Sequence, residues 1–136
     1  FGLDVSESTS PELFLTDRER TFFSKKFVSD RPILLLQTNG GAQGQELKYS
    51  WARDIPPHLS AELVNILSQK YHVIQICRSK EQGIPGAEVV HDTMTNMELF
   101  SLLLFSERRI LIDSCLQHAS VALGLKSTVL WVSTSP

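Results

Sequence analysis

The sequence predicts an α/β fold built on a doubly wound parallel sheet. Short continuous apolar runs recur along the chain, and stretches with apolar residues at helical spacing separate them. Strands that are apolar on both faces are typical of a parallel sheet covered by helices on both sides. Right-handed crossovers then place the first and fourth strands side by side at the centre, with the second and third strands beyond the first.

The length and composition fit one globular domain. The chain has 136 residues, of which 42% are hydrophobic and 21% are charged, as in ordinary soluble proteins. The formal net charge of -2 argues against a surface dedicated to nucleic acid or to an anionic membrane. No apolar stretch approaches the roughly 18 residues of a membrane span. The chain starts at Phe1 and carries no signal peptide, so we expect a fragment of a longer protein.

The cysteines and histidines predict neither a disulfide nor a metal site. Cys77 and Cys115 lie far apart in the sequence, and we expect both to be reduced thiols of a cytosolic protein. The spacing of Cys115 and His118 would permit contact on a helix, but nothing else in the sequence supports a nucleophilic pair. The four histidines are scattered without metal-ligand spacing.

The N-terminal segment divides near residue 16. Residues 1–15 show no period and are interpreted as a linker or the tail of a missing N-terminal domain, whereas residues 16–136 would form the domain itself. Thr16 followed by Glu19 predicts a helix that starts with a capping box and runs through "LTDRERTFFSKKF". Three phenylalanines would supply its apolar face: Phe22, Phe23 and Phe27.

The remaining elements follow in strict alternation. The apolar run from Ile33 to about Gln37 predicts the first strand, and a long loop follows it. The third helix would begin at Thr95 or Asn96, and Gly124 would end the last helix. The other predicted elements are helices within 58–71, 94–107 and 114–123, and strands at 72–77, 88–91, 108–112 and 127–132.

Two polar segments leave the central strands of this predicted sheet. In open α/β sheets, ligands bind at the carboxyl ends of the strands beside the topological switch point. Here the switch point lies between the first and fourth strands. The loop from Thr38 to Trp51 and the stretch from Asp113 to His118 are therefore expected to meet in one crevice.

The second of these segments allows both a structural and a functional interpretation. Asp113 and Ser114 precede a helix, where both residue types cap well. The same helix end favours a phosphate group, in which case Asp113 would accept hydrogen bonds from sugar hydroxyls, because like charges repel. His118 would either donate to a ligand or be a satisfied core histidine, and its spacing alone favours the core.

The first segment resembles neither of the common phosphate loops. Its glycines at 40, 41 and 44 permit close approach of a ligand to the backbone. The pattern is neither GxGxxG nor a P-loop, so those nucleotide sites are disfavoured. Lys48 would be a phosphate partner or simply solvated, and spacing alone favours the solvated state.

At these segments the sequence resembles a known family. The stretch "ILIDSCLQHASVALGLKSTVLWVSTSP" is similar to the donor-site signature of the ADP-heptose:lipopolysaccharide heptosyltransferases of glycosyltransferase family 9. That signature has Asp, then Ser or Thr, then Gly, two further residues, the pattern H-x-A-x-A-L-G, a strand and a G-x-T-x-P turn. "ILLLQTNGGAQGQELKYSW" also resembles the strand and loop of the family, and the likeness covers about residues 11–136. The matching residues are Asp113, Ser114, His118, Ala122, Leu123, Gly124, Thr134 and Pro136.

The resemblance implies the C-terminal, donor-binding half of a glycosyltransferase B architecture with two Rossmann-like domains. It implies inverting transfer from a nucleotide-sugar, in particular an ADP-sugar, without a metal or other cofactor. The catalytic base and most acceptor contacts would come from the missing N-terminal domain, so no catalytic residue is expected in this chain. The acceptor would be the lipopolysaccharide core or another glycan. The protein would lie in the bacterial cytoplasm. Any peripheral contact with the inner membrane would come through the parent protein.

The resemblance also assigns roles at the helix start. Asp113 would bind the hydroxyls of the donor sugar, and the backbone of Ser114 and Cys115 would face the diphosphate. His118 would line the same pocket.

Four further positions are implied outside that helix. Thr38 and Lys48 would approach the phosphates from the loop after the first strand. Glu81, after the second strand, and Met94, before the third helix, would frame the nucleoside.

The chain departs from the family pattern at the site itself. Cys115 replaces the glycine after Asp-Ser, and Val132 and Ser133 replace the glycine and proline of the final turn. These changes keep two alternatives open. One is a degenerate, non-catalytic binding module of the same fold, and the other is a nucleotide-sugar epimerase-type domain.

Overall fold

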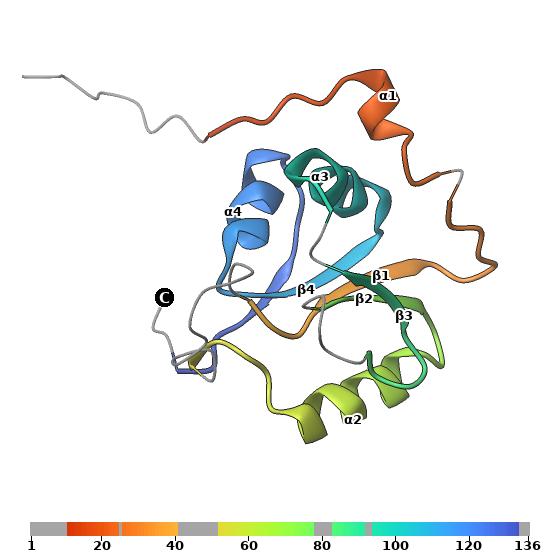
Figure 1. Ribbon diagram of the computed structural model, residues 1–136, viewed down its shortest axis with the longest axis vertical. Helices are drawn as coiled ribbons and strands as arrows, with labels where there is room; N and C mark the ends of the chain where they lie inside the picture. Colours follow the sequence, from red (N-terminus) through yellow and green to blue (C-terminus); the bar gives the residue numbers. More distant parts are fainter. Residues whose placement is uncertain (1–10, 25, 41–51, 78–82, 92–93, 134–136) are drawn as a thin grey trace, which may run out of the picture.

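The structure is a computed structural model that describes residues 11–24, 26–40, 52–77, 83–91 and 94–133. Five parallel strands form one sheet in the order β3-β2-β1-β4-β5 (Figure 1). The elements are α1 (Asp17–Arg20), β1 (Ile33–Gln37), α2 (Pro57–Leu67), β2 (His72–Cys77), β3 (Glu88–His91), α3 (Asn96–Phe105), β4 (Arg108–Ile112), α4 (Cys115–Ala122) and β5 (Thr128–Leu130).

This architecture confirms the predicted fold class. β1 and β4 are neighbours at the centre, and β2 and β3 lie beyond β1. The first four strands have the predicted bounds, because each apolar run ends at a polar residue or a turn. β5 is shorter than predicted, since only Thr128–Leu130 pairs with β4.

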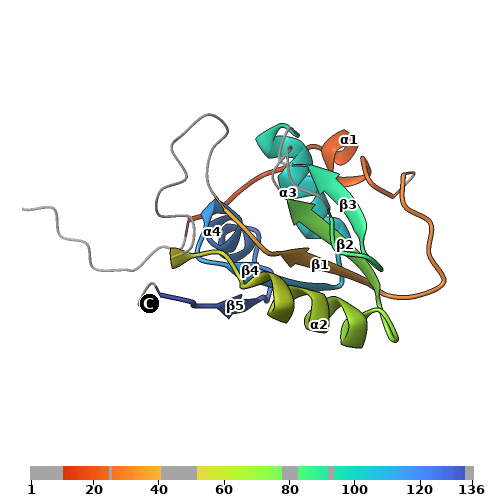
Figure 2. The same ribbon diagram turned by 60° about the horizontal axis from the view of Figure 1, so that its bottom comes forward.

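Helices cover both faces of the sheet. α3 and α4 lie on one side and α2 lies on the other, as Figures 1 and 2 show from two directions. Side chains of β1 alternate between these layers: Leu35 belongs to the cluster under α3 and α4, whereas Leu34 and Leu36 pack with Val64 of α2. All of β1 is buried, as expected for a central strand with a helix layer on each side.

Two helices begin with complete capping boxes. The hydroxyl of Thr16 accepts a hydrogen bond from the Glu19 N–H at the start of α1, and Thr95 and Glu98 repeat the arrangement at α3. Both helix starts agree with the sequence, and Thr95 is the cap of α3. In each box the hydrogen bonds from the threonine hold the pKa of the glutamate below its ordinary value.

The first helix is shorter than the sequence predicted. α1 ends at Arg20 and continues as turns, so its phenylalanines do not share one helical face. Phe23 and Phe27 are buried, but Phe22 is 44% exposed. The prediction of a common apolar face is therefore wrong for Phe22. The described end of the predicted linker packs on the domain, because the Leu13 N–H donates to the Ala122 carbonyl at 3.0 Å.

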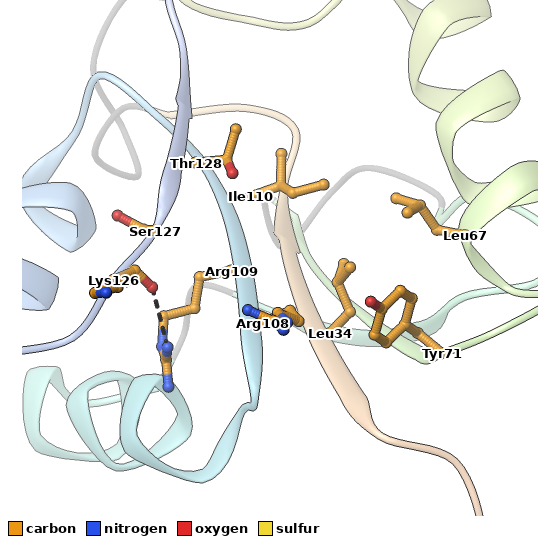
Figure 3. Close-up of a pocket in the computed structure, with 9 residues that line it drawn as sticks. All are labelled: Leu34, Leu67, Tyr71, Arg108, Arg109, Ile110, Lys126, Ser127 and Thr128. Atoms are coloured by element: carbon orange, nitrogen blue, oxygen red, sulfur yellow. Dashed lines mark hydrogen bonds between the residues drawn. The ribbon is translucent and has the colours of Figure 1, made fainter.

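A buried arginine ties the end of α3 to the segment before β5. Arg109 is 9% exposed. Its guanidinium donates to the carbonyls of Leu103 (2.7 Å), Lys126 (3.1 Å) and Ser106, and the bond to Lys126 is drawn in Figure 3. Burial lowers the pKa of Arg109, and the neighbouring Arg108 acts in the same direction. The arginine thus satisfies carbonyls that a helix end leaves without partners.

Candidate functional site

The carboxyl ends of β1 and β4 meet at the switch point, as predicted. The Ser114 Oγ at the start of α4 donates to Oε1 of Gln37 at the end of β1, over 2.8 Å. Gly40 passes so close to β4 that a Cβ there would lie 3.2 Å from Cδ1 of Ile112. The two segments therefore lie side by side where the sequence predicted the crevice, although they are far apart in sequence.

Ser114 is the cap of α4, and Asp113 is not. The Ser114 hydroxyl oxygen accepts from the Leu116 N–H at 3.2 Å while its proton goes to Gln37. Asp113 is half-buried, and its carboxylate has no hydrogen bond or ion pair with any residue that the structure describes. The capping interpretation is therefore confirmed for Ser114 and wrong for Asp113.

The first turn of α4 has one backbone N–H without an acceptor among the described residues. The Cys115 N–H has no hydrogen-bond acceptor within the described ranges, whereas the Gln117 N–H donates to the Ser114 carbonyl at 3.2 Å. Unsatisfied N–H groups at a helix start attract anions, and the helix dipole adds to this attraction. The Cys115 side chain is exposed beside them, where the family pattern has glycine.

His118 is a surface residue. The buried residues of α4 are Leu116, Ala119 and Ser120, and His118 is exposed on the other side. The alternative of a satisfied core histidine is therefore wrong. No hydrogen bond joins His118 to the Cys115 thiol in the described part of the chain, so the structure offers no activated nucleophile there.

Thr38 lies beneath the crevice rather than at its surface. It is 4% exposed, and its Oγ1 accepts from Nε2 of Gln75 at 2.9 Å. The carbonyl of Thr38 accepts from the Ile55 N–H at 2.9 Å. The hydroxyl proton of Thr38 has no acceptor in the segments described.

Of the three remaining predicted site residues, only Met94 lies among the residues that the structure describes. Met94 is half-buried and packs against the hydrophobic cluster under α3 and α4. Lys48 and Glu81 lie outside the described residues, and so do Trp51, Thr134 and Pro136 of the family pattern. The roles predicted for these residues stay predictions.

Two buried glutamines and one aspartate were missed by the sequence interpretation. Gln37 and Gln75 are both buried in the sheet, and Oε1 of Gln75 accepts from the Ile84 N–H at 2.8 Å. Asp54 accepts from the Gly40 N–H at 3.2 Å. The available signal was a glutamine in each of two otherwise apolar strands, "ILLLQ" and "HVIQIC", since a buried amide needs hydrogen-bond partners.

A cavity of about 300 Å³ lies at the opposite edge of the sheet. Its lining includes Leu34, Arg108 and Ile110 of the central strands and Lys126 before β5 (Figure 3). Of its basic groups, the guanidinium of Arg109 is already bonded to main-chain carbonyls. The cavity is distinct from the crevice, since helix starts and their free N–H groups gather at the carboxyl edge.

Two searches of the described ranges give negative results. They contain no group of three or more His, Cys, Asp or Glu side chains arranged to hold a metal ion. They also contain no helix long and apolar enough to cross a bilayer.

Comparison with known proteins identifies the fold. No family model matches the sequence, and no curated protein matches it. The crystal structure of a glycosyl transferase family 9 protein from Veillonella parvula DSM 2008 matches 98% of this chain with a TM-score of 0.69. This chain has the fold of part of a family 9 glycosyl transferase.

The match confirms the predicted resemblance at the level of fold. The two sequences are 15% identical, and this chain covers 41% of the chain of the Veillonella protein. At this identity the match shows the fold alone, which is a Rossmann-like domain. The chain spans less than half of that relative, so donor, acceptor and reaction belong to the proposal that follows.

Proposed function

We propose that this chain is the donor-binding, C-terminal domain of an inverting glycosyltransferase that uses a nucleotide-sugar. The observation that carries the proposal is the start of α4 at the switch point. There the Asp113 carboxylate and the Cys115 N–H, neither of which has a hydrogen-bond partner among the described residues, belong to neighbouring positions of one helix start, in a fold shared with a family 9 glycosyl transferase.

The two groups suit different parts of one ligand. The Cys115 N–H and the helix dipole attract the diphosphate. Asp113 would repel a phosphate but accepts hydrogen bonds from sugar hydroxyls, so it selects the sugar end. His118 would line the same pocket from the next turn. Lys48 and the Thr38 hydroxyl would add contacts to the phosphates, and Glu81 and Met94 would frame the nucleoside.

The reaction needs little covalent chemistry from this domain. An acceptor hydroxyl attacks the anomeric carbon as the bond from that carbon to the β-phosphate oxygen breaks. The nucleoside diphosphate leaves, and the configuration at the anomeric carbon of the transferred sugar is inverted. Positioned N–H donors stabilise the charge that develops on the diphosphate. The acceptor proton passes to a base of the N-terminal domain, and no metal ion or other cofactor takes part.

The wider assignment follows from the same proposal. The preferred donor is an ADP-sugar, and the acceptor is the lipopolysaccharide core or another glycan. The N-terminal domain of the same protein completes the site. The parent protein would be bacterial, act in the cytoplasm and reach the inner membrane only as a peripheral protein.

Titration of the 136-residue chain with ADP, UDP, GDP and ADP-heptose tests the proposal. We expect ADP and ADP-heptose to raise the melting temperature and to shift the amide resonances around Asp113. A lack of response to all four ligands would show that the crevice is not a donor site.

Replacement of Asp113 separates sugar from phosphate recognition. We expect Asp113→Ala to weaken binding of ADP-heptose roughly ten- to hundredfold, because a charge-assisted hydrogen bond contributes about 1.5–3 kcal/mol. Binding of ADP alone should change little. Calorimetric titration of both ligands measures the difference, and equal losses would limit Asp113 to a structural role.

One observation favours a second candidate, a non-catalytic binding module. The Cys115 side chain occupies the helix start, where it narrows the approach to the backbone. Such a module would bind the bare nucleotide but discriminate poorly between ADP and ADP-heptose, so the same titrations distinguish the two candidates.

A further inference from the structure

Gln37 is an unusual residue for the centre of a parallel sheet. It is 5% exposed and follows four buried apolar residues in β1. Burial of an amide group is unfavourable unless both its donor and acceptor are satisfied. In this structure both are, because Nε2 donates to the Asn39 carbonyl at 3.3 Å and Oε1 accepts from Ser114 at 2.8 Å.

The bond to Ser114 joins the two sides of the switch point. Asn39 lies in the loop after β1, and Ser114 lies between β4 and α4. One side chain therefore holds the loop on one side and the helix start on the other. A substitution of Gln37 would therefore remove one hydrogen bond to the loop after β1 and one to the start of α4.

The same bond determines what the cap of α4 can offer to a ligand. A serine hydroxyl has one proton to donate, and Ser114 donates it to Gln37. The Ser114 Oγ also accepts a hydrogen bond from the Leu116 N–H, at 3.2 Å. Ser114 consequently has no hydroxyl proton left for a phosphate, and the Cys115 N–H becomes the donor at this position.

We propose that Gln37 is a positioning residue of the diphosphate subsite, which acts through the Ser114 hydroxyl to aim the Cys115 N–H into the crevice. This inference rests on the proposed donor-binding function and adds a residue that does not itself contact the ligand. Gln75 is bonded instead to Thr38 and Ile84, so it does not reach α4.

A double-mutant cycle tests the coupling. Gln37→Met keeps the side-chain length but removes both hydrogen-bonding groups, and Ser114→Ala removes the hydroxyl. We expect each variant to lower the affinity for ADP roughly three- to tenfold, which is the range of one hydrogen bond. Because both variants break the bond between Gln37 and Ser114, the double variant should lose less ADP affinity than the sum of the two single losses.

Two further readouts separate positioning from general loosening. Affinity for adenosine, which has no phosphate, should stay unchanged in the Gln37→Met chain, and the Cys115 amide resonance should shift in the absence of ligand. Ser120→Ala serves as the control, since it removes a buried hydroxyl of α4 that bonds to the Leu125 carbonyl far from the crevice. It should lower stability without a change in ADP affinity.

The outcomes distinguish the two levels of the proposal. If the wild-type chain binds ADP and the variants bind it equally well, or lose ADP and adenosine affinity by the same factor, the role of Gln37 is disproved and the donor site stands. Additive losses in the double variant would also disprove it. If the wild-type chain binds no nucleoside diphosphate, the donor site fails and the role of Gln37 fails with it. Should Gln37→Met not fold, Ser114→Ala alone must still lower the affinity for ADP and spare that for adenosine.

Discussion

At the scale of single residues, Cys115 and Asp113 share one turn but differ in what they can do. Asp113 has a carboxylate without a partner among the described residues, so it is available to a polar ligand. Cys115 contributes its backbone, whereas its exposed side chain stands beside the donor that a diphosphate would need. This thiol therefore reports directly on occupancy of the crevice.

Alkylation of Cys115 should slow when nucleotide is bound. We expect saturating ADP to reduce the rate of its reaction with iodoacetamide several-fold, since the bound diphosphate would cover the thiol. Mass spectrometry of the labelled peptides measures the rate. Cys77, which is 1% exposed, provides an internal control and should remain unlabelled in the folded protein. Equal rates with and without ADP, at concentrations where ADP is bound, would mean that the nucleotide lies elsewhere.

At the scale of elements, side chains hold the helix ends in place on the sheet. Threonine and glutamate form capping boxes at the starts of α1 and α3, and Ser114 caps the start of α4. Arg109 closes the end of α3 and fixes the segment before β5. These contacts matter for function because α4 can aim its N–H groups only if its position on the sheet is defined.

Removal of the Arg109 side chain should destabilise the whole domain. Arg109→Met removes the donor to the carbonyls of Leu103, Ser106 and Lys126, of which the Leu103 carbonyl still accepts from the Ser106 hydroxyl. We expect the free energy of unfolding to fall by about 2–4 kcal/mol, the range for a broken buried network. Urea denaturation followed by circular dichroism measures it.

Two comparison variants sharpen the Arg109 experiment. Arg109→Lys keeps the charge but cannot reach several carbonyls at once. Its free energy of unfolding should therefore fall by at least part of the amount expected for Arg109→Met. Arg108→Met changes an exposed neighbour and should cost far less. If Arg109→Met were as stable as Arg108→Met, the hydrogen bonds of Arg109 would contribute little to stability.

The elements differ in how well the sequence predicted them. β1, β2, β3 and β4 match their predicted bounds because an apolar run of strand length has one clear place in a parallel sheet. The predicted length of the helix after Thr16 is wrong. Its capping box marks the start of the helix, but no local signal marks the end at Arg20. Capping preferences likewise allowed both Asp113 and Ser114, and only the backbone geometry selects Ser114.

At the scale of the whole molecule, topology predicted where the site lies but not how it is held together. The switch point follows from strand order, which alternation and crossover handedness predict. The bond from Gln37 to Ser114 spans 77 positions of sequence. It depends on which face of β1 each residue occupies and on how α4 docks, so no local pattern could reveal it. The expectation from spacing alone that His118 is a core histidine is wrong for the same reason, because the docking of α4 decides which of its sides is buried.

The whole molecule should bind a donor without completing its transfer. In the proposed division of labour, this domain holds the nucleotide-sugar, and the acceptor is deprotonated by a base of the N-terminal domain. Donor binding alone stabilises the leaving diphosphate but brings no nucleophile. The 136-residue chain should bind ADP-heptose in a calorimetric titration. It should nevertheless release ADP from this donor no faster than buffer does, with or without a lipopolysaccharide acceptor. A ³¹P resonance assay follows the release. Transfer by this chain alone would overturn the division of labour, and conversion of the donor sugar without any acceptor would instead identify an epimerase-type domain.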